Sequence, residues 1–152
     1  MTDAASKALP NGETWRALVE AATRAQGHAY APYSGYRVGA ALLAPDGAIF
    51  TGCNVENASY GVTLCAERSA VAHLVAAGRS RIAAIAVVTA GPEPGRPCGL
   101  CRQTLSEFAD DDLAIGLAVA GDTSPRVIDR LGDIFAHPFR GDLVRSDLVK
   151  KS

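Results

Sequence analysis

Two long apolar runs constrain the fold of this chain more than any other feature. Residues 82–89 and 113–120 are almost entirely aliphatic, and such runs are typical of strands buried on both faces of a sheet. A helical pattern at 99–109 separates them, and another at 64–78, whose apolar stripe includes Val75, precedes them. Long helices that alternate with apolar strands predict an α/β sheet covered by helices.

Turn residues locate a hairpin before these elements. Residues 36–44 and 48–55 have strand-like composition, and Pro45-Asp46-Gly47 stands between them. Proline presets φ and glycine supplies a positive φ, so this tripeptide predicts a tight turn. The sequence therefore predicts an antiparallel pair added to the sheet.

The two ends of the chain give weaker patterns. A first helix is expected to begin at Asn11 or Thr14, which are suitable capping residues, and to end at Gly27 near His28. Residues 126–139 predict a short strand followed by irregular or helical structure.

Composition favours one cytoplasmic domain that spans residues 1–152, with a flexible tail from about residue 144. Of the residues, 48% are hydrophobic and 20% are charged, as in ordinary globular proteins. Fifteen Lys and Arg against sixteen Asp and Glu give a net charge of -1, which disfavours binding to polynucleotides. No apolar run approaches the roughly 20 residues of a membrane span, and residues 1–10 contain no secretory signal. We therefore expect neither a membrane nor a polynucleotide partner.

Three of the four cysteines have the spacing of metal ligands. Cys98 and Cys101 are three residues apart at the start of a predicted helix, where they can bind one ion and where thiolates are favoured. Cys65 begins the neighbouring helix and would supply a third thiolate. Three protein ligands leave tetrahedral zinc one open position, as in catalytic sites. The alternative is a structural site in which Cys53 is the fourth ligand.

An acid and two arginines accompany these cysteines. Glu67 follows Cys65 by two residues, so it can lie beside the metal without binding it. Zinc lowers the pKa of its water from about 16 to about 7, and a carboxylate can take the released proton and deliver it to a substrate. Arg68, or failing that Arg102, can offset the excess negative charge of three thiolates.

The spacing of Cys65, Glu67, Cys98 and Cys101 is the signature of zinc deaminases. Specific motifs surround it: Ala31-Pro32-Tyr33-Ser34, Val38-Gly39-Ala40-Ala41, Gly52-Cys53-Asn54-Val55-Glu56-Asn57-Ala58-Ser59-Tyr60, Cys65-Ala66-Glu67-Arg68 and Pro97-Cys98-Gly99-Leu100-Cys101-Arg102-Gln103. Over about residues 15–143, the chain closely resembles the small homotetrameric cytidine deaminases.

The resemblance implies a three-layer α-β-α fold with a five-stranded mixed sheet and one zinc ion per subunit at Cys65, Cys98 and Cys101. It also implies a homotetramer with sites shared between subunits. Glu67 matches the residue that moves protons while water attacks C4 of cytosine and ammonia departs. The implied enzyme is a hydrolase of pyrimidine salvage that converts cytidine and 2′-deoxycytidine to uridine and 2′-deoxyuridine.

The same resemblance assigns residues to the substrate. Asn54 and Glu56 match the pair that binds the ribose 3′-hydroxyl, which an amide and a carboxylate can do as donor and acceptor. Tyr36 stands where the family usually has a phenylalanine that lines the base pocket. Ala66, between a ligand and the acid, is also expected in the pocket.

Two aromatic residues match positions that reach into a neighbouring subunit's site. These are Tyr60 and Phe139, and Phe135 competes with Phe139 because the family's usual Leu-Leu-Pro reads Ile134-Phe135-Ala136 here. This altered segment leaves a second substrate class open, namely a modified cytosine nucleoside such as a blasticidin-type antibiotic. The alternative that is not an enzyme is a non-catalytic, zinc-stabilised binding module, but such a module would have no use for Glu67.

Overall fold

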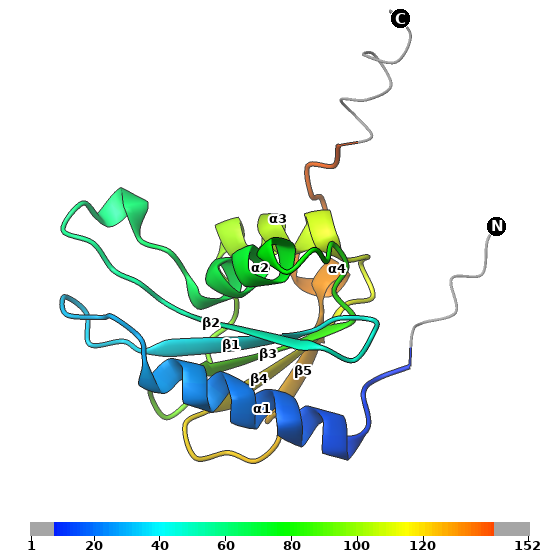
Figure 1. The fold of residues 1–152 in the computed structure, drawn as a ribbon, viewed down its shortest axis with the longest axis horizontal. Coiled ribbons are helices and arrows are strands. Elements are labelled where there is room, and N and C mark those ends of the chain that lie inside the picture. Colours follow the sequence, from blue (N-terminus) through cyan, green and yellow to red (C-terminus); the bar gives the residue numbers. More distant parts are fainter. Residues whose placement is uncertain (1–7, 142–152) are drawn as a thin grey trace, which may run out of the picture.

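In the computed structural model, which describes residues 8–141, a five-stranded sheet lies between two layers of helices (Figure 1). Helix α1 (Gly12–Gly27) covers one face, whereas α2 (Ala66–Ala76), α3 (Gly99–Phe108) and the short α4 (Leu131–Ile134) lie on the other. The three-layer α-β-α architecture with a mixed sheet is thus confirmed. The tail expected to be flexible from about residue 144 lies outside the described residues.

The sheet has the strand order β2-β1-β3-β4-β5. In chain order the strands are β1 (Val38–Leu43), β2 (Ile49–Cys53), β3 (Ala84–Thr89), β4 (Ala114–Val119) and β5 (Val127–Arg130). The central pair, β3 and β4, is parallel and buried at every residue, as the apolar runs predict, and α3 makes the crossover between them. The other neighbouring pairs are antiparallel.

Two glycines let helices approach the predicted β1–β2 hairpin closely. A Cβ at Gly39 would lie 2.0 Å from the carbonyl oxygen of Ala22 in α1, and one at Gly52 would lie 2.3 Å from the amide nitrogen of Ala70 in α2. Neither backbone contact could relax without moving a helix. Gly52 therefore fixes the distance between β2 and α2, the helix that carries the acid of the site.

The apolar residues form one core on each face of the sheet. The core under α1 contains Trp15, Leu18 and Val19, and α1 begins at the Asn11 cap, whose Oδ1 accepts a hydrogen bond from the backbone N–H of Thr14 at 2.8 Å. The core on the opposite face includes Leu42, Phe50, Leu74, Leu105 and Leu117.

Some local features differ from the sequence prediction. Val75, assigned to the apolar stripe of α2, is 47% exposed, and a short 3₁₀ helix at Tyr60–Val62 was not predicted. The segment after residue 126 forms β5 and then α4, as expected. Within residues 8–141, no helix combines the length and apolarity of a membrane span.

Candidate metal centre and active-site cavity

The starts of α2 and α3 bring three cysteine thiols together. Cys65 is the residue before α2, Cys98 is the residue before α3, and Cys101 lies in the first turn of α3. All three sulfur atoms lie within 4.8 Å of one another. The Sγ atoms of Cys65 and Cys98 are 3.8 Å apart, and those of Cys98 and Cys101 are 3.5 Å apart.

This spacing fits a zinc ion. Two sulfurs that each lie about 2.3 Å from a tetrahedral zinc are separated by about 3.8 Å, and thiolates are ligands that zinc prefers. Cys53, at the end of β2, is a partly buried free cysteine and does not belong to the cluster. The structural alternative with Cys53 as fourth ligand is therefore not formed.

The electrostatics of the three-cysteine cluster also favour a bound cation. Hydrogen bonds from Cys101 and Cys98, together with the positive charge of Arg68, lower the pKa of Cys65 to about 6 although burial opposes this. The hydrogen bond to Cys65, burial and the charge of Glu67 raise the pKa of Cys101. One thiolate therefore forms easily, whereas the formation of a second is opposed by the negative charges of the first thiolate and of Glu67. A bound divalent cation offsets this repulsion.

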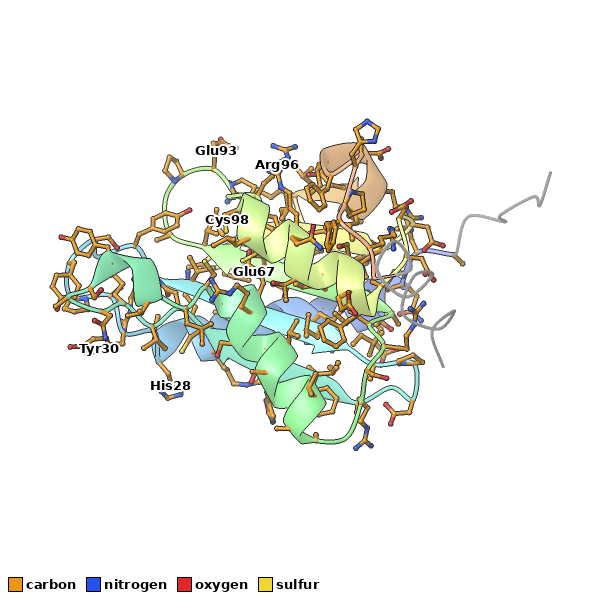
Figure 2. All side chains as sticks on the ribbon, turned by 90° about the horizontal axis from the view of Figure 1, so that it is seen from above. His28, Tyr30, Glu67, Glu93, Arg96 and Cys98 are labelled. Atoms are coloured by element: carbon orange, nitrogen blue, oxygen red, sulfur yellow. The ribbon has the colours of Figure 1, made fainter. Side chains whose placement is uncertain are left out.

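Glu67 lies in the first turn of α2 and is only 5% exposed. Burial is the main cause that raises the pKa of its carboxyl, and the nearby Cys65 adds to this effect. Figure 2 shows Glu67 and Cys98 in the space between α2 and α3, whereas His28 lies at the edge of the molecule. A buried acid that is held beside the thiols is suited to moving protons.

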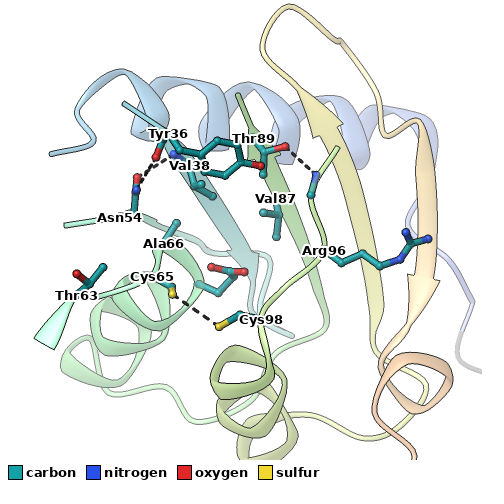
Figure 3. A pocket seen from close by; sticks show the side chains of 12 residues that line it. Tyr36, Val38, Asn54, Thr63, Cys65, Ala66, Val87, Thr89, Arg96 and Cys98 are labelled. Atoms are coloured by element: carbon teal, nitrogen blue, oxygen red, sulfur yellow. Dashed lines mark hydrogen bonds between the residues drawn. The ribbon is translucent and has the colours of Figure 1, made fainter. Parts of the chain in front are cut away.

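Glu67 and two of the thiols line a cavity of about 200 Å³ (Figure 3). Its walls come from the start of β1, the ends of β2 and β3, the start of α2 and the loop before α3. The lining residues are Tyr36, Val38, Asn54, Thr63, Cys65, Ala66, Glu67, Val87, Thr89, Gly95, Arg96 and Cys98. Ala66, Asn54 and Tyr36, which the resemblance assigns to the substrate, are thus all at this cavity.

Asn54 has a structural task besides facing the cavity. Its Oδ1 accepts a hydrogen bond from the backbone N–H of Val38 at 2.9 Å, and its Nδ2 donates one to the carbonyl oxygen of Tyr36 at 2.8 Å. Figure 3 shows both bonds beside the Tyr36 ring. A side-chain amide has a second N–H and a second lone pair, so Asn54 keeps one donor and one acceptor for a ligand.

Glu56 lies in a neighbouring cavity of about 270 Å³, with Tyr33, Ser34, Tyr60 and Thr63. Thr63 lines both cavities, so the two adjoin. The Ser34 hydroxyl donates a hydrogen bond to Oε1 of Glu56, and the backbone N–H of Tyr33 donates one to Oε2 at 2.8 Å. These bonds, the first above all, hold the pKa of Glu56 below its usual range. The carboxylate is therefore ionised and fixed in direction.

The aromatic residues expected at a subunit contact are on the surface. Tyr60 is 74% exposed and packs edge-on against Tyr33, and Phe139 is 64% exposed. Neither lines the cavity of Glu67. Phe135 instead packs, partly buried, against the main core, so of the two competing phenylalanines Phe139 is the exposed one.

The two arginines of the motifs behave differently. Arg68 acts on Cys65 through its charge. Arg102 does not contact a sulfur: it donates hydrogen bonds of 2.8 Å to the carbonyl oxygens of Pro97 and Ile134. Of the two candidates for offsetting thiolate charge, Arg68 has the supporting charge interaction, whereas Arg102 anchors the backbone of Pro97 and Ile134.

The sequence did not indicate several residues that line the cavity. Val38, Val87 and Thr89 belong to strands, and Gly95 and Arg96 belong to the loop just before Cys98. For Gly95 and Arg96, the only available signal was that their loop comes just before Cys98, a predicted metal ligand. The local sequence pattern does not show which way such a loop folds.

Comparisons with known proteins agree with this geometry. A family described as the cytidine and deoxycytidylate deaminase zinc-binding region matches residues 13–117. A cytidine deaminase of Mycobacterium tuberculosis is 46% identical over 125 residues, which cover 82% of this chain and 89% of the relative. One from Halalkalibacterium halodurans is 47% identical over 100 residues, covering 66% and 76%. The crystal structure of cytidine deaminase from Burkholderia pseudomallei is 46% identical, with a TM-score of 0.75 over 81% of this chain and 97% of that one.

Proposed function

The chain belongs to the cytidine and deoxycytidylate deaminase family, and we propose that it hydrolyses cytidine and 2′-deoxycytidine to uridine and 2′-deoxyuridine, with release of ammonia. One observation supports this proposal more strongly than the others. A buried acid, Glu67, lines the same cavity as Cys65 and Cys98, which are two of the three thiols clustered at zinc-binding distances. A purely structural metal site would gain nothing from an acid in that place.

We assign the metal to Cys65, Cys98 and Cys101, one zinc ion per subunit. When bound, zinc would activate water for attack on C4 of the cytosine ring. The thiols come from two helices, so the ion would also tie the start of α2 to the start of α3. Arg68, close enough to lower the pKa of Cys65, would offset part of the negative charge of the ligands.

Glu67 is the proposed proton carrier. Its carboxylate would accept a proton from the attacking water and deliver it to N3 of the base. It would then take the remaining proton of the hydroxyl now on C4 and give it to the amino group, which leaves as ammonia while the C4 carbonyl forms. Such acid–base assistance is typically worth about 10²–10⁴ in rate. The burial of Glu67 supports this role, because it keeps the carboxyl away from bulk solvent and raises its pKa above the usual range.

Asn54 and Glu56 are the proposed sugar-binding residues. The free donor and acceptor of Asn54, and the fixed negative charge of Glu56, suit the 3′-hydroxyl of a ribose or a deoxyribose. The two adjoining cavities, joined at Thr63, support the division of the site into a part for the base and a part for the sugar. Tyr36 and Ala66 would contact the base.

The relatives described above are named cytidine deaminases, which favours an ordinary cytosine nucleoside over a modified one. We further propose a cytoplasmic homotetramer that serves pyrimidine salvage. Its support is the exposure of Tyr60 and Phe139, aromatic rings that a neighbouring subunit would cover. Four free cysteines also suit a reducing compartment.

The test is a panel of cytosine nucleosides, followed by the change in ultraviolet absorbance when the amino group is lost, with zinc measured on the same sample. The proposal expects about one zinc per chain and turnover of both cytidine and 2′-deoxycytidine. Bound zinc with no turnover of any nucleoside would instead indicate a binding module.

A further inference from the structure

The loop at residues 91–97 forms one wall of the cavity and is anchored on the sheet. The backbone N–H of Gly95 donates a hydrogen bond of 2.9 Å to Oγ1 of Thr89, a residue at the end of β3 that is 3% exposed. Next to it, Nε of Arg96 is 2.7 Å from a carboxylate oxygen of Asp129 on β5. The wall is therefore tied to two strands of the sheet.

Both ends of the same loop are held as well. Arg126 donates a hydrogen bond of 2.8 Å to the carbonyl oxygen of Pro92, and Arg102 donates one of the same length to the carbonyl oxygen of Pro97. Four attachments over six residues leave this segment little freedom to shift. If a side chain added to the loop clashes with a neighbouring residue, we therefore expect this partner residue to move and the loop to stay in place.

The Tyr36 ring is that partner. In Figure 3 it reaches from its own backbone beside Asn54 across the cavity to Thr89, opposite Cys65 and Cys98. The side chain is 44% exposed, and within residues 8–141 its hydroxyl makes no hydrogen bond. Packing alone therefore holds the ring in place, so the ring is less firmly anchored than the loop opposite it.

Gly95 provides the space for the end of this ring. A Cβ at position 95 would lie 2.8 Å from Oη of Tyr36, closer than such atoms approach in proteins, and 3.2 Å from Cγ2 of Thr89. Gly95 does not have a positive φ, so its backbone conformation does not require glycine. The reason for glycine here is the room that the tyrosine hydroxyl occupies.

We propose that Gly95 is a positioning residue for the deamination reaction, because it sets where the Tyr36 ring lies over the substrate cavity. The inference rests on the proposed function, in which Tyr36 contacts the base. Tyr36 and Gly95 form a matched pair: with the ring where it lies in this structure, the tyrosine hydroxyl occupies the room that a side chain at position 95 would need. A side chain there displaces the ring, either into the cavity or out to solvent, and substrate binding weakens in both cases.

The test is Gly95→Ala, measured as KM and kcat for cytidine. We expect KM to rise by about tenfold, a size typical of coupled neighbours, with kcat within about twofold and with zinc content unchanged. Adding Tyr36→Phe removes the atom that clashes. The double variant is then expected to have a KM within about twofold of that of Tyr36→Phe alone.

Thr89→Ser supplies the matched control. It keeps the hydroxyl that binds the Gly95 N–H and removes Cγ2, the other atom near the added Cβ. If Tyr36 is the affected partner, Thr89→Ser does not rescue Gly95→Ala. Rescue by Thr89→Ser, or an unchanged KM in Gly95→Ala itself, would overturn the proposal. If Gly95→Ala does not fold, recovery of folding by Tyr36→Phe supports the pair, and recovery by Thr89→Ser or by neither change refutes it.

A failure of the proposed function gives a different result. A wild-type protein that turns over no cytosine nucleoside would refute the activity but leave the pair to be tested by crystallography. Crystal structures of Gly95→Ala and Gly95→Ala/Tyr36→Phe are expected to show ring 36 displaced in the first and restored in the second. A Tyr36 ring that stays in place in Gly95→Ala would contradict the inference whatever the substrate.

Discussion

The side chain of Gln103 makes two hydrogen bonds with the backbone of Phe139. Its Nε2 donates to the carbonyl oxygen of Phe139 at 2.7 Å, and its Oε1 accepts from the N–H of Phe139 at 3.0 Å. Gln103 lies on α3, two residues after the proposed zinc ligand Cys101. The helix that begins at the metal centre therefore also holds the segment that presents the exposed Phe139 ring.

The first prediction concerns this pair. Gln103→Met removes both hydrogen bonds at nearly constant volume, so the Phe139 ring loses its fixed position. We expect kcat/KM for cytidine to fall by about three- to tenfold, in line with two lost hydrogen bonds. If Gln103 acts through Phe139, Gln103→Met combined with Phe139→Ala costs no more activity than Phe139→Ala alone. Additive losses would show an independent role.

The second prediction separates the two phenylalanines. Phe135 packs against the main core, whereas Phe139 is largely exposed in the single chain. Phe135→Ala is expected to lower the free energy of unfolding by about 2–4 kcal/mol. Phe139→Ala is expected to change it by less than about 1 kcal/mol at protein concentrations that leave the subunits apart, yet to lower kcat/KM more. Urea denaturation and cytidine kinetics give both quantities, and the reverse ranking would assign the catalytic contact to Phe135.

The third prediction uses Cys53 as the control for the metal ligands. Cys65→Ser removes one thiolate of the cluster, and we expect zinc to be lost and turnover to fall by more than the about 10–100-fold typical of groups around a ligand. Cys53 lies outside the cluster, so Cys53→Ser is expected to keep both the zinc and the turnover. Elemental analysis measures the zinc content, and the deamination assay measures the turnover. Loss of zinc in Cys53→Ser would revive the four-cysteine site.

The fourth prediction concerns the sugar. Asn54→Ala leaves the backbone groups of Val38 and Tyr36 without their partner, so it is expected to lower stability by about 1–3 kcal/mol besides raising KM. Glu56→Gln is the cleaner variant, because Glu56 is only partly buried and glutamine keeps its shape and one acceptor oxygen. It loses one of the hydrogen bonds that Ser34 and Tyr33 donate to the carboxylate, so we expect a smaller loss of stability than in Asn54→Ala, together with a higher KM for cytidine. An unchanged KM would remove Glu56 from the substrate site.

The sequence predicts the elements well because local rules determine them. The apolar runs become the buried strands β3 and β4, Pro45-Asp46-Gly47 becomes a turn with φ of 87° at Gly47, and Asn11 caps α1. Exposure is predicted less well. Val75 has the spacing of a core residue, but it is 47% exposed, whereas Leu74 and Ala77 on either side of it pack in the core.

The spacing of the cysteines and the acid in the sequence predicts the metal centre. It does not predict the cavity around that centre. Cys65 and Glu67 share a helix start, so their proximity is encoded locally. The approach of Gly95 to Tyr36 joins a loop before α3 to the residues before β1, and it exists only after the sheet has formed. Likewise, sequence motifs pair Asn54 with Glu56, but the structure shows them lining adjoining cavities.

The central claim is that Glu67 carries protons beside a zinc ion that it does not bind. The most direct test is Glu67→Gln, with cytidine turnover, zinc content and melting temperature measured on one preparation. We predict about one zinc per chain, an unchanged fold and a turnover that is lower by at least about 10²-fold. Near-normal turnover in this variant would contradict the account, and so would loss of zinc, which would make Glu67 a ligand.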